Sequence, residues 1–161
     1  MKRILIVQIG GTIAGGYEND QLVYGGGPRE LIGKYLSKAG IGTNTLDIVP
    51  SDPNIQIDFT IDYDVLFFKN STEVTDDDRL KIAAYLQAVN YDQIIVLYGN
   101  NPESYFRTEK YVKEVVKRKT IVFVGSKKPF DVYFSDAPIF LGMAITMVQL
   151  KEPGVYHVIN F

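Results

Sequence analysis

The sequence predicts a three-layer α/β fold built on a mostly parallel, doubly wound sheet. Short apolar runs at 4–9, 65–68, 93–97, 120–124 and 155–159 have the pattern of strands that are buried on both faces. Segments with helical periodicity lie between these runs, which is the alternation expected of a parallel sheet. Each of the first four runs ends in glycine or polar residues, and ligands of such sheets bind at the carboxyl ends of the strands.

The length and composition place the chain among ordinary globular domains. With 161 residues, it is expected to form a single domain over 1–161. The net charge of −2 gives no electrostatic reason to expect a nucleic acid or a membrane surface as a partner. The absence of cysteine excludes disulfides and thiolate metal sites and fits a cytoplasmic protein. No apolar run is long enough to cross a bilayer, and no metal or cofactor site is predicted.

The first third of the chain predicts a strand over 4–9 and then a glycine-rich turn, Gly10–Gly16. Residues 17–27 are polar, rich in glycine and without a period, so we expect a loop. Pro28 suits the start of a helix that Gly40 ends, and 45–49 is a short strand stopped by Pro50. Alternating residues within 51–63 allow a half-exposed strand or a hairpin arm.

The remaining elements alternate regularly. A strand over 65–68 precedes a helix from Thr75 to about Val89, whose start has the Thr75 and Asp78 spacing of a capping box. A strand over 93–97, a helix from Pro102 to about Arg118, a strand over 120–124, a loop over 131–135, a helix over 138–150 and a strand over 155–159 follow. The residues expected on the inner faces of the first two helices are Leu80, Ala83, Ala84 and Leu86, then Phe106, Val112, Val115 and Val116.

Four polar strand exits are the places to look for a site: Gly10–Gly16, Asn70–Glu73, Gly99–Asn101 and Gly125–Lys128. The first surrounds the hydroxyl of Thr12 with glycines, which allow close backbone approach. A phosphate loop is disfavoured, because no lysine and hydroxyl residue follow the last glycine. A dinucleotide fingerprint is broken where Thr12 replaces its second glycine. The remaining interpretations are a plain turn and a nucleophile at the sheet edge.

Six segments in order resemble the N-terminal domain of the bacterial-type L-asparaginase/glutaminase family. The first, Gly10-Gly11-Thr12-Ile13-Ala14-Gly15, is similar to the first threonine motif of that family. The others are Asn70–Asp78, Tyr91-Asp92 with 94–99, Lys119–Pro129, Ser135-Asp136-Ala137-Pro138 and Gly154-Val155 with the strand that follows. One such match is weak evidence, but six in order over nearly the whole chain are specific for the fold.

The resemblance implies an amidohydrolase that acts on a small-molecule amide or amino acid without a cofactor. Thr12 corresponds to the family nucleophile, Tyr24 to the tyrosine that activates or orients it, and Lys119 to a catalytic lysine. The residues expected to contact substrate are Gly11, Ser71, Thr72, Asn100 and Asn101. The resemblance also implies a homo-oligomer, and the C-terminal domain of the family is expected to be absent from 1–161.

The departures from the family pattern concentrate at one exit. Asn100 replaces the second threonine, and Asn101 replaces the aspartate that pairs with the substrate ammonium group. A charge-assisted contact thereby becomes a neutral one, and neutral contacts are about half as strong. We therefore expect weak or altered amidase activity or, as an alternative, an inactive ligand-binding or interaction domain. Because Lys119 lacks its family partners and precedes a strand, a plain solvated lysine is the favoured alternative to the catalytic role, and His157 is expected to be structural.

Overall fold

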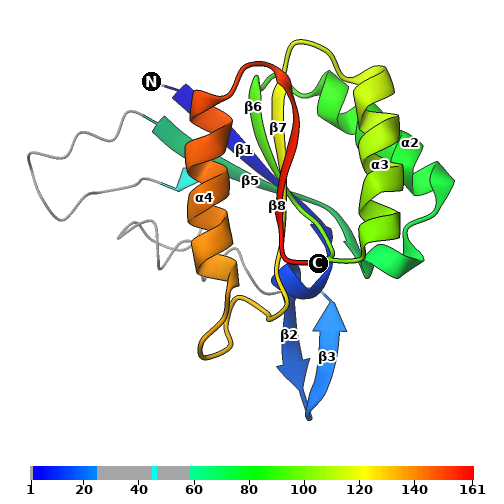
Figure 1. The fold of residues 1–161 in the computed structure, drawn as a ribbon, viewed down its shortest axis with the longest axis vertical. Helices are drawn as coiled ribbons and strands as arrows, with labels where there is room; N and C mark the ends of the chain where they lie inside the picture. The colour runs from blue at the N-terminus through cyan, green and yellow to red at the C-terminus, as the bar shows by residue number, and fades with distance from the viewer. Residues whose placement is uncertain (1, 25–44, 47–58) are drawn as a thin grey trace, which may run out of the picture.

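A six-stranded sheet forms the centre of the molecule (Figure 1). The computed structural model describes residues 2–24, 45–46 and 59–161. The strand order is β4-β5-β1-β6-β7-β8, and β4 alone runs antiparallel to its neighbour. The strands are β1 (Lys2–Gly10), β4 (Thr45–Leu46), β5 (Phe59–Lys69), β6 (Gln93–Leu97), β7 (Thr120–Gly125) and β8 (Gly154–Ile159). The predicted mostly parallel α/β fold is therefore confirmed.

Helices cover both faces of the sheet, as Figure 1 shows. Along β1, Ile4 and Ile6 point into a core that they share with α4 (Ala137–Leu150). Leu5 and Val7 point into a second core, formed with α2 (Asp76–Ala88) and α3 (Pro102–Val115). Consecutive buried residues on one strand explain why the sequence shows continuous apolar runs rather than alternation.

The last crossover of the sheet has an unusual hand. The units β5–α2–β6, β6–α3–β7 and β7–α4–β8 all step in the same direction across the sheet. The helices α2 and α3 pack on one face, whereas α4 packs on the other. The third unit therefore has the opposite hand to the first two. Such connections are right-handed in nearly all proteins, so we assign the right hand to the first two units. The β7–α4–β8 unit, which has the opposite hand, is then left-handed. Its loop leaves β7 toward the α4 face of the sheet.

The helix α2 begins where the sequence predicts. Thr75 and Asp78 form the predicted capping box, in which each side chain accepts a hydrogen bond from the other residue's backbone N–H. The predicted inner face is only partly right, because Leu80 is 54% exposed and Ala84 is also exposed. The buried positions are Asp78, Arg79, Ile82, Ala83 and Leu86. Because Asp78 and Arg79 occupy part of the buried face, the residues that face the core are not the set that the apolar pattern predicts.

The helix α3 is shorter than predicted and differently rotated. It ends at Val115 rather than near Arg118. Val112 and Val116 are buried as predicted, but Phe106 and Val115 are exposed. The inward positions in the first two turns belong to Ser104, Tyr105 and Thr108. Ser104 and Thr108 face a buried tyrosine hydroxyl, and this polar contact sets the rotation of the helix.

The segment after Thr12 is a hairpin rather than the predicted loop. Strand β2 (Gly15–Glu18) pairs antiparallel with β3 (Gln21–Tyr24). Between them Asn19 and Asp20 have φ of 49° and 62°, the two positive values that a type I′ turn requires.

Other boundaries differ less. Strand β5 begins at Phe59, earlier than the predicted 65, and the predicted strand 45–49 is described only over Thr45–Leu46. The expected helix from Pro28 and the segment 47–58 lie outside the described residues. Within the described part of the chain, no helix is long and apolar enough to cross a membrane.

Candidate active site

The exit of β1 is packed backbone to backbone against two other exits. Gly10 and Gly11 have φ of 135° and 74°, which L side chains rarely adopt. A Cβ on Gly10 would lie 2.1 Å from the carbonyl oxygen of Lys69, and one on Gly11 would lie 2.4 Å from the Cα of Gly99. The N–H of Gly11 donates to the carbonyl of Lys69 at 2.9 Å. Only glycine fits at both positions.

The other exits interlock in the same way. A Cβ on Gly99 would lie 2.2 Å from the Oγ of Ser71, and one on Gly125 would lie 3.0 Å from the carbonyl oxygen of Tyr98. The N–H of Tyr98 donates to the carbonyl of Val124 at 2.9 Å. The four exits singled out in the sequence are thus brought together at one edge of the sheet.

Thr12 opens a short 3-10 helix, η1 (Thr12–Ala14), at this edge. The next two residues, Ile13 and Ala14, are fully buried, whereas Thr12 is partly exposed. The Thr12 carbonyl accepts the N–H of Gly15. Within the described residues, the Thr12 hydroxyl makes no side-chain hydrogen bond. The buried neighbours therefore hold in place a threonine that is partly exposed at this edge of the sheet.

The hairpin brings the backbone of Tyr24 close to Thr12. Tyr24 pairs directly with Gly15, which is three residues after Thr12. The N–H of Gly11, by contrast, is already bonded to Lys69, so Gly11 shapes the turn and its N–H is not available to a substrate. Tyr24 therefore remains a candidate for a catalytic role, whereas Gly11 shapes the turn.

Three predicted substrate residues line one pocket of about 240 Å³. Ser71 and Thr72 reach it from the 3-10 helix η2 (Ser71–Glu73), and Asn101 reaches it from the start of α3. Its remaining lining residues are Val74, Arg79, Glu103, Ser104 and Arg107. Asn70 caps η2 in a second capping box, with its side chain accepting the N–H of Thr72 and its own N–H donating to Glu73. The structure therefore groups Ser71, Thr72 and Asn101.

Asn101 has a structural duty as well as its place in the pocket. Its Oδ1 accepts the N–H of Ser104 at 2.9 Å and caps the N-terminus of α3. Asn100, the residue before it, is partly buried. Because Oδ1 is occupied by the helix, a ligand would meet chiefly the amide NH₂ group of Asn101.

A buried polar network that sequence reasoning missed lies behind this exit. The hydroxyl of Tyr98 is 2.9 Å from Ser104 Oγ and 2.7 Å from Thr108 Oγ1. Arg79 donates from Nε to Thr108 Oγ1 at 3.1 Å and from a terminal nitrogen to Ser104 Oγ at 3.3 Å. Ser104 Oγ in turn donates to the Ser71 carbonyl. The network ties η2, α2, α3 and β6 together beneath the pocket.

Asp76 neutralises the cations of this network. It forms ion pairs with Arg79 at 3.0 Å and with Arg107. Burial raises the pKa of Asp76, but the two guanidinium groups outweigh this and hold it below its usual value. In the sequence, Ser104 and Thr108 lie one helical turn apart, but this spacing does not identify Arg79 and Tyr98 as their partners.

Lys119 lies away from the other predicted site residues. It comes directly before β7, so it lies at the amino edge of a parallel sheet whose carboxyl edge carries Thr12. Its Nζ donates to the carbonyl oxygens of Leu86, at 2.8 Å, and Val89, at the end of α2. Burial lowers the pKa of Lys119. This position does not suit the catalytic role predicted for Lys119, and its ammonium group binds two backbone carbonyls rather than being the plain solvated group of the alternative.

Two further groups complete the surroundings of the exits. The backbone N–H groups of Lys127 and Lys128 donate to the carboxylate of Asp136, which fixes the loop after β7. His157 lies on β8, with Nδ1 3.1 Å from the Tyr105 hydroxyl, and its side chain is exposed. The described residues hold no cluster of three or more groups suited to a metal ion.

The fold and the converging exits define an α/β domain that presents a threonine hydroxyl at the carboxyl edge of its sheet. The chain belongs to the asparaginase family, in which it matches the N-terminal domain over residues 3–160. The family predicted from the sequence is therefore confirmed. Among curated proteins, no sequence is significantly similar to this chain.

Solved L-asparaginase structures share this fold. A probable cytoplasmic L-asparaginase from Campylobacter jejuni superposes with a TM-score of 0.75 at 23% identity, over 99% of this chain and 47% of its own. The thermostable L-asparaginase from Thermococcus kodakarensis gives 0.73 at 19% identity, over 97% and 43%. L-asparaginase I from Vibrio cholerae O1 biovar eltor gives 0.63 at 22% identity, over 91% and 40%. The chain thus spans less than half of each of these proteins.

Proposed function

We propose that this domain carries an asparaginase-type amidohydrolase site with Thr12 as its nucleophile. The observation that supports this most is the close packing of four strand exits at the turn that leads into Thr12, a partly exposed threonine followed by two fully buried residues. Such a fixed hydroxyl has the low conformational freedom that nucleophilic catalysis needs. Membership of the asparaginase family supports the reaction class.

The proposed reaction has two steps. Thr12 Oγ1 attacks the carbonyl carbon of a side-chain amide, the C–N bond breaks, and ammonia leaves with the hydroxyl proton. Water then cleaves the resulting ester and releases the acid. Tyr24 is the proposed partner of Thr12, because its backbone pairs with Gly15 in the hairpin that follows the nucleophile. Lys119 has no part in this scheme, since it caps α2.

Substrate is proposed to bind along Ser71, Thr72 and Asn101, which line a common pocket. The neutral Asn101 offers a substrate ammonium group no opposite charge, so asparagine should bind weakly. Asn100 carries no hydroxyl that can relay a proton. We therefore expect low activity on asparagine, or activity on an amide that lacks a free α-amino group.

An alternative, a ligand-binding domain without turnover, is favoured by the same exit. Asn101 is committed to capping α3, and Tyr98 is committed to the buried network. Both side chains therefore have structural reasons to be present that require no chemistry.

Ammonia release separates the two hypotheses. The protein and its Thr12→Ala variant are incubated with asparagine, glutamine and simple primary amides, and ammonia is measured over time. Release that disappears in the variant supports the enzyme. Equal release from both proteins across the panel contradicts it, and a shift in melting temperature with aspartate but no turnover favours the binding domain. A homo-oligomeric state and a cytoplasmic location stay predictions from the sequence.

A further inference from the structure

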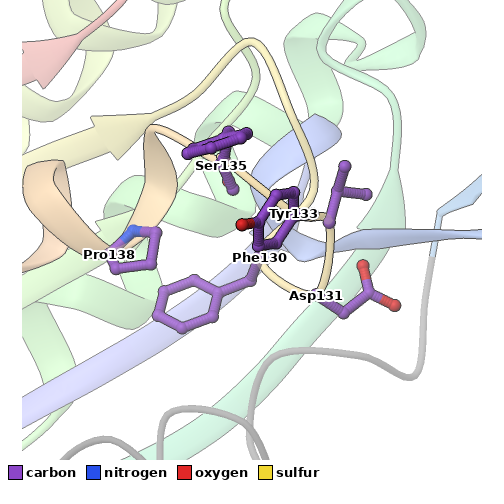
Figure 2. Close-up of a pocket in the computed structure, with 7 residues that line it drawn as sticks. Phe130, Asp131, Tyr133, Ser135 and Pro138 are labelled. Carbon is purple, nitrogen blue, oxygen red and sulfur yellow. The ribbon is translucent and has the colours of Figure 1, made fainter.

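A hollow of about 420 Å³ lies in the loop that connects β7 to α4 (Figure 2). Its lining residues are Phe130, Asp131, Val132, Tyr133, Phe134, Ser135 and Pro138. In Figure 2 the ring of Phe130 and Pro138 lie to one side of the hollow, and the hydroxyl of Tyr133 points toward them. Three of the seven residues are aromatic, so flat rings form part of the walls, beside the polar side chains of Asp131 and Ser135.

The loop holds two large aromatic side chains in solvent. Tyr133 is 82% exposed and Phe134 is 81% exposed, and their ring centroids lie 4.2 Å apart at an angle of 53°. Phe134 also has a φ of 56°, a left-handed conformation that is rare for a bulky residue. Neither the packing of the described core nor any described hydrogen bond of these two side chains accounts for their presence at the surface.

The conformation of the loop is fixed by hydrogen bonds. The N–H of Val132 donates to the Pro129 carbonyl and the N–H of Ser135 to the Val132 carbonyl. Ser135 Oγ donates to the Lys128 carbonyl at 3.2 Å and accepts the N–H of Ala137 at 3.0 Å. Two successive turns and a serine bridge therefore fix the backbone of the loop, and a preformed hollow is the form that small-molecule sites usually take.

The hollow adjoins the segment that carries Thr12. Phe130 is buried in the same core cluster as Ile13 and Ala14, the two residues after Thr12. On the other side, the Asp131 carboxylate lies 3.5 Å from where a Cβ on Gly16 would be. Four residues of chain reach at most about 14 Å, which limits how far Thr12 can lie from the Gly16 edge of the hollow.

We propose that this hollow receives an aryl group on the acyl part of the substrate, so that the preferred substrate is an arylalkyl primary amide. This inference rests on the proposed function, whose substrate class it specifies. The volume suits one ring with a short chain and is too small for a polypeptide segment. Flat aromatic walls favour a flat aromatic ligand, since rings attract one another in stacked and tilted arrangements.

The proposal also accounts for the neutral exit at Asn101. An arylalkyl amide has no ammonium group, so it does not need the acidic residue that Asn101 replaces. In this proposal the substrate is recognised by the aromatic residues that follow β7, and not by a charged residue after β6. The chemistry is unchanged: the Thr12 ester forms on the acyl carbon, ammonia takes the hydroxyl proton, and water then releases the arylalkanoic acid.

Turnover is the first test. We expect 3-phenylpropionamide to be hydrolysed with a kcat/KM about tenfold above that of hexanamide, an alkyl amide of similar length. Tyr133→Ala should remove this preference. Leu150→Ala is the matched control, since Leu150 is a comparably exposed apolar residue at the end of α4. Equal rates on both amides, or a preference that survives Tyr133→Ala, would overturn the proposal.

Binding is the second test and does not depend on catalysis. In the Thr12→Ala variant, ligand-observed NMR should detect 3-phenylpropionamide at concentrations at which hexanamide gives no signal. Adding Tyr133→Ala should weaken this binding several-fold. If aryl binding behaves so while no amide releases ammonia, the hydrolase proposal fails and the aryl site stands. If ammonia is released but aryl binding does not depend on Tyr133, the hydrolase stands and the aryl site fails.

Discussion

The exits of β1 and β6 lie against each other but are built by different means. At β1 the shape comes from backbone alone, because Gly10 and Gly11 press on Lys69 and Gly99 with no room for a side chain. At β6 one glycine, Gly99, packs closely as well, but side chains also shape the exit, with Asn101 capping α3 and Tyr98 anchored by Ser104. One exit presents the threonine; the other supports a pocket and a helix.

This difference explains why only one of the two exits departs from the asparaginase pattern. Gly10 and Gly11 have positive φ, and a Cβ on either would lie less than 3.0 Å from neighbouring backbone atoms, so no other residue fits at these positions. Side chains at an exit can change their function while the fold persists, provided that their capping and hydrogen-bonding duties are met. Asparagine caps a helix as well as aspartate does, so the exchange at Asn101 removes a charge without loosening α3.

The largest expected effect is at the β1 exit. Gly11→Ala should lower the free energy of unfolding by about 4 kcal/mol, because the new Cβ meets the backbone of Gly99 in a strained conformation. Two alanine substitutions serve as controls. Gly16→Ala makes only an ordinary contact and should be nearly neutral, and Gly142→Ala in open space on α4 should stabilise by up to about 1 kcal/mol. Urea denaturation measures all three, and similar losses for Gly11 and Gly16 would contradict the packing account.

The second effect concerns the support of the β5 exit. Burial raises the pKa of Asp78, but hydrogen bonds from Lys69 and Thr75 lower it to about 2, below the usual 3.8. Because the folded pKa is depressed, the stabilisation is complete above pH 4 and is lost as the pH falls toward 2. We expect a loss of about 2 kcal/mol in this window. Asp78→Asn should flatten the curve there, and an unchanged slope would contradict the assignment.

The third effect tests whether the β6 exit can regain its charge. Asn101→Asp keeps the cap and adds an anion near the ammonium position, so aspartate should bind about tenfold more tightly by calorimetry. The melting temperature should stay the same, because both residues cap equally well. Asn101→Ala should instead cost about 1 kcal/mol through the lost cap. Affinity that is unchanged in Asn101→Asp would mean that Asn101 does not face the ligand.

Much of the fold could be predicted because its strands are buried on both faces. Continuous apolar runs located β1, β6, β7 and β8, and the Thr75 and Asp78 pair located the start of α2. The hairpin after Thr12 was missed because glycine and polar residues resemble a loop. Its Asn19-Asp20 turn signal was nevertheless present in the sequence.

The site was less predictable, because its side chains take their positions from distant partners. The burial of Arg79 depends on Ser104 and Thr108, which lie 25 and 29 residues away and cannot be assigned from a helical pattern. The location of Lys119, by contrast, was predictable. Its position directly before a parallel strand already places it at the amino edge of the sheet, opposite the edge that carries Thr12.

The most direct test of the central claim is to trap the acyl-enzyme on Thr12. The protein is quenched in acid during steady-state turnover of 3-phenylpropionamide and of asparagine, digested, and analysed by mass spectrometry. We predict that the peptide containing Thr12 gains the mass of the acyl group, at that residue, and that Thr12→Ala shows no adduct. Ammonia release without an adduct on Thr12, or an adduct on another residue, would contradict the account.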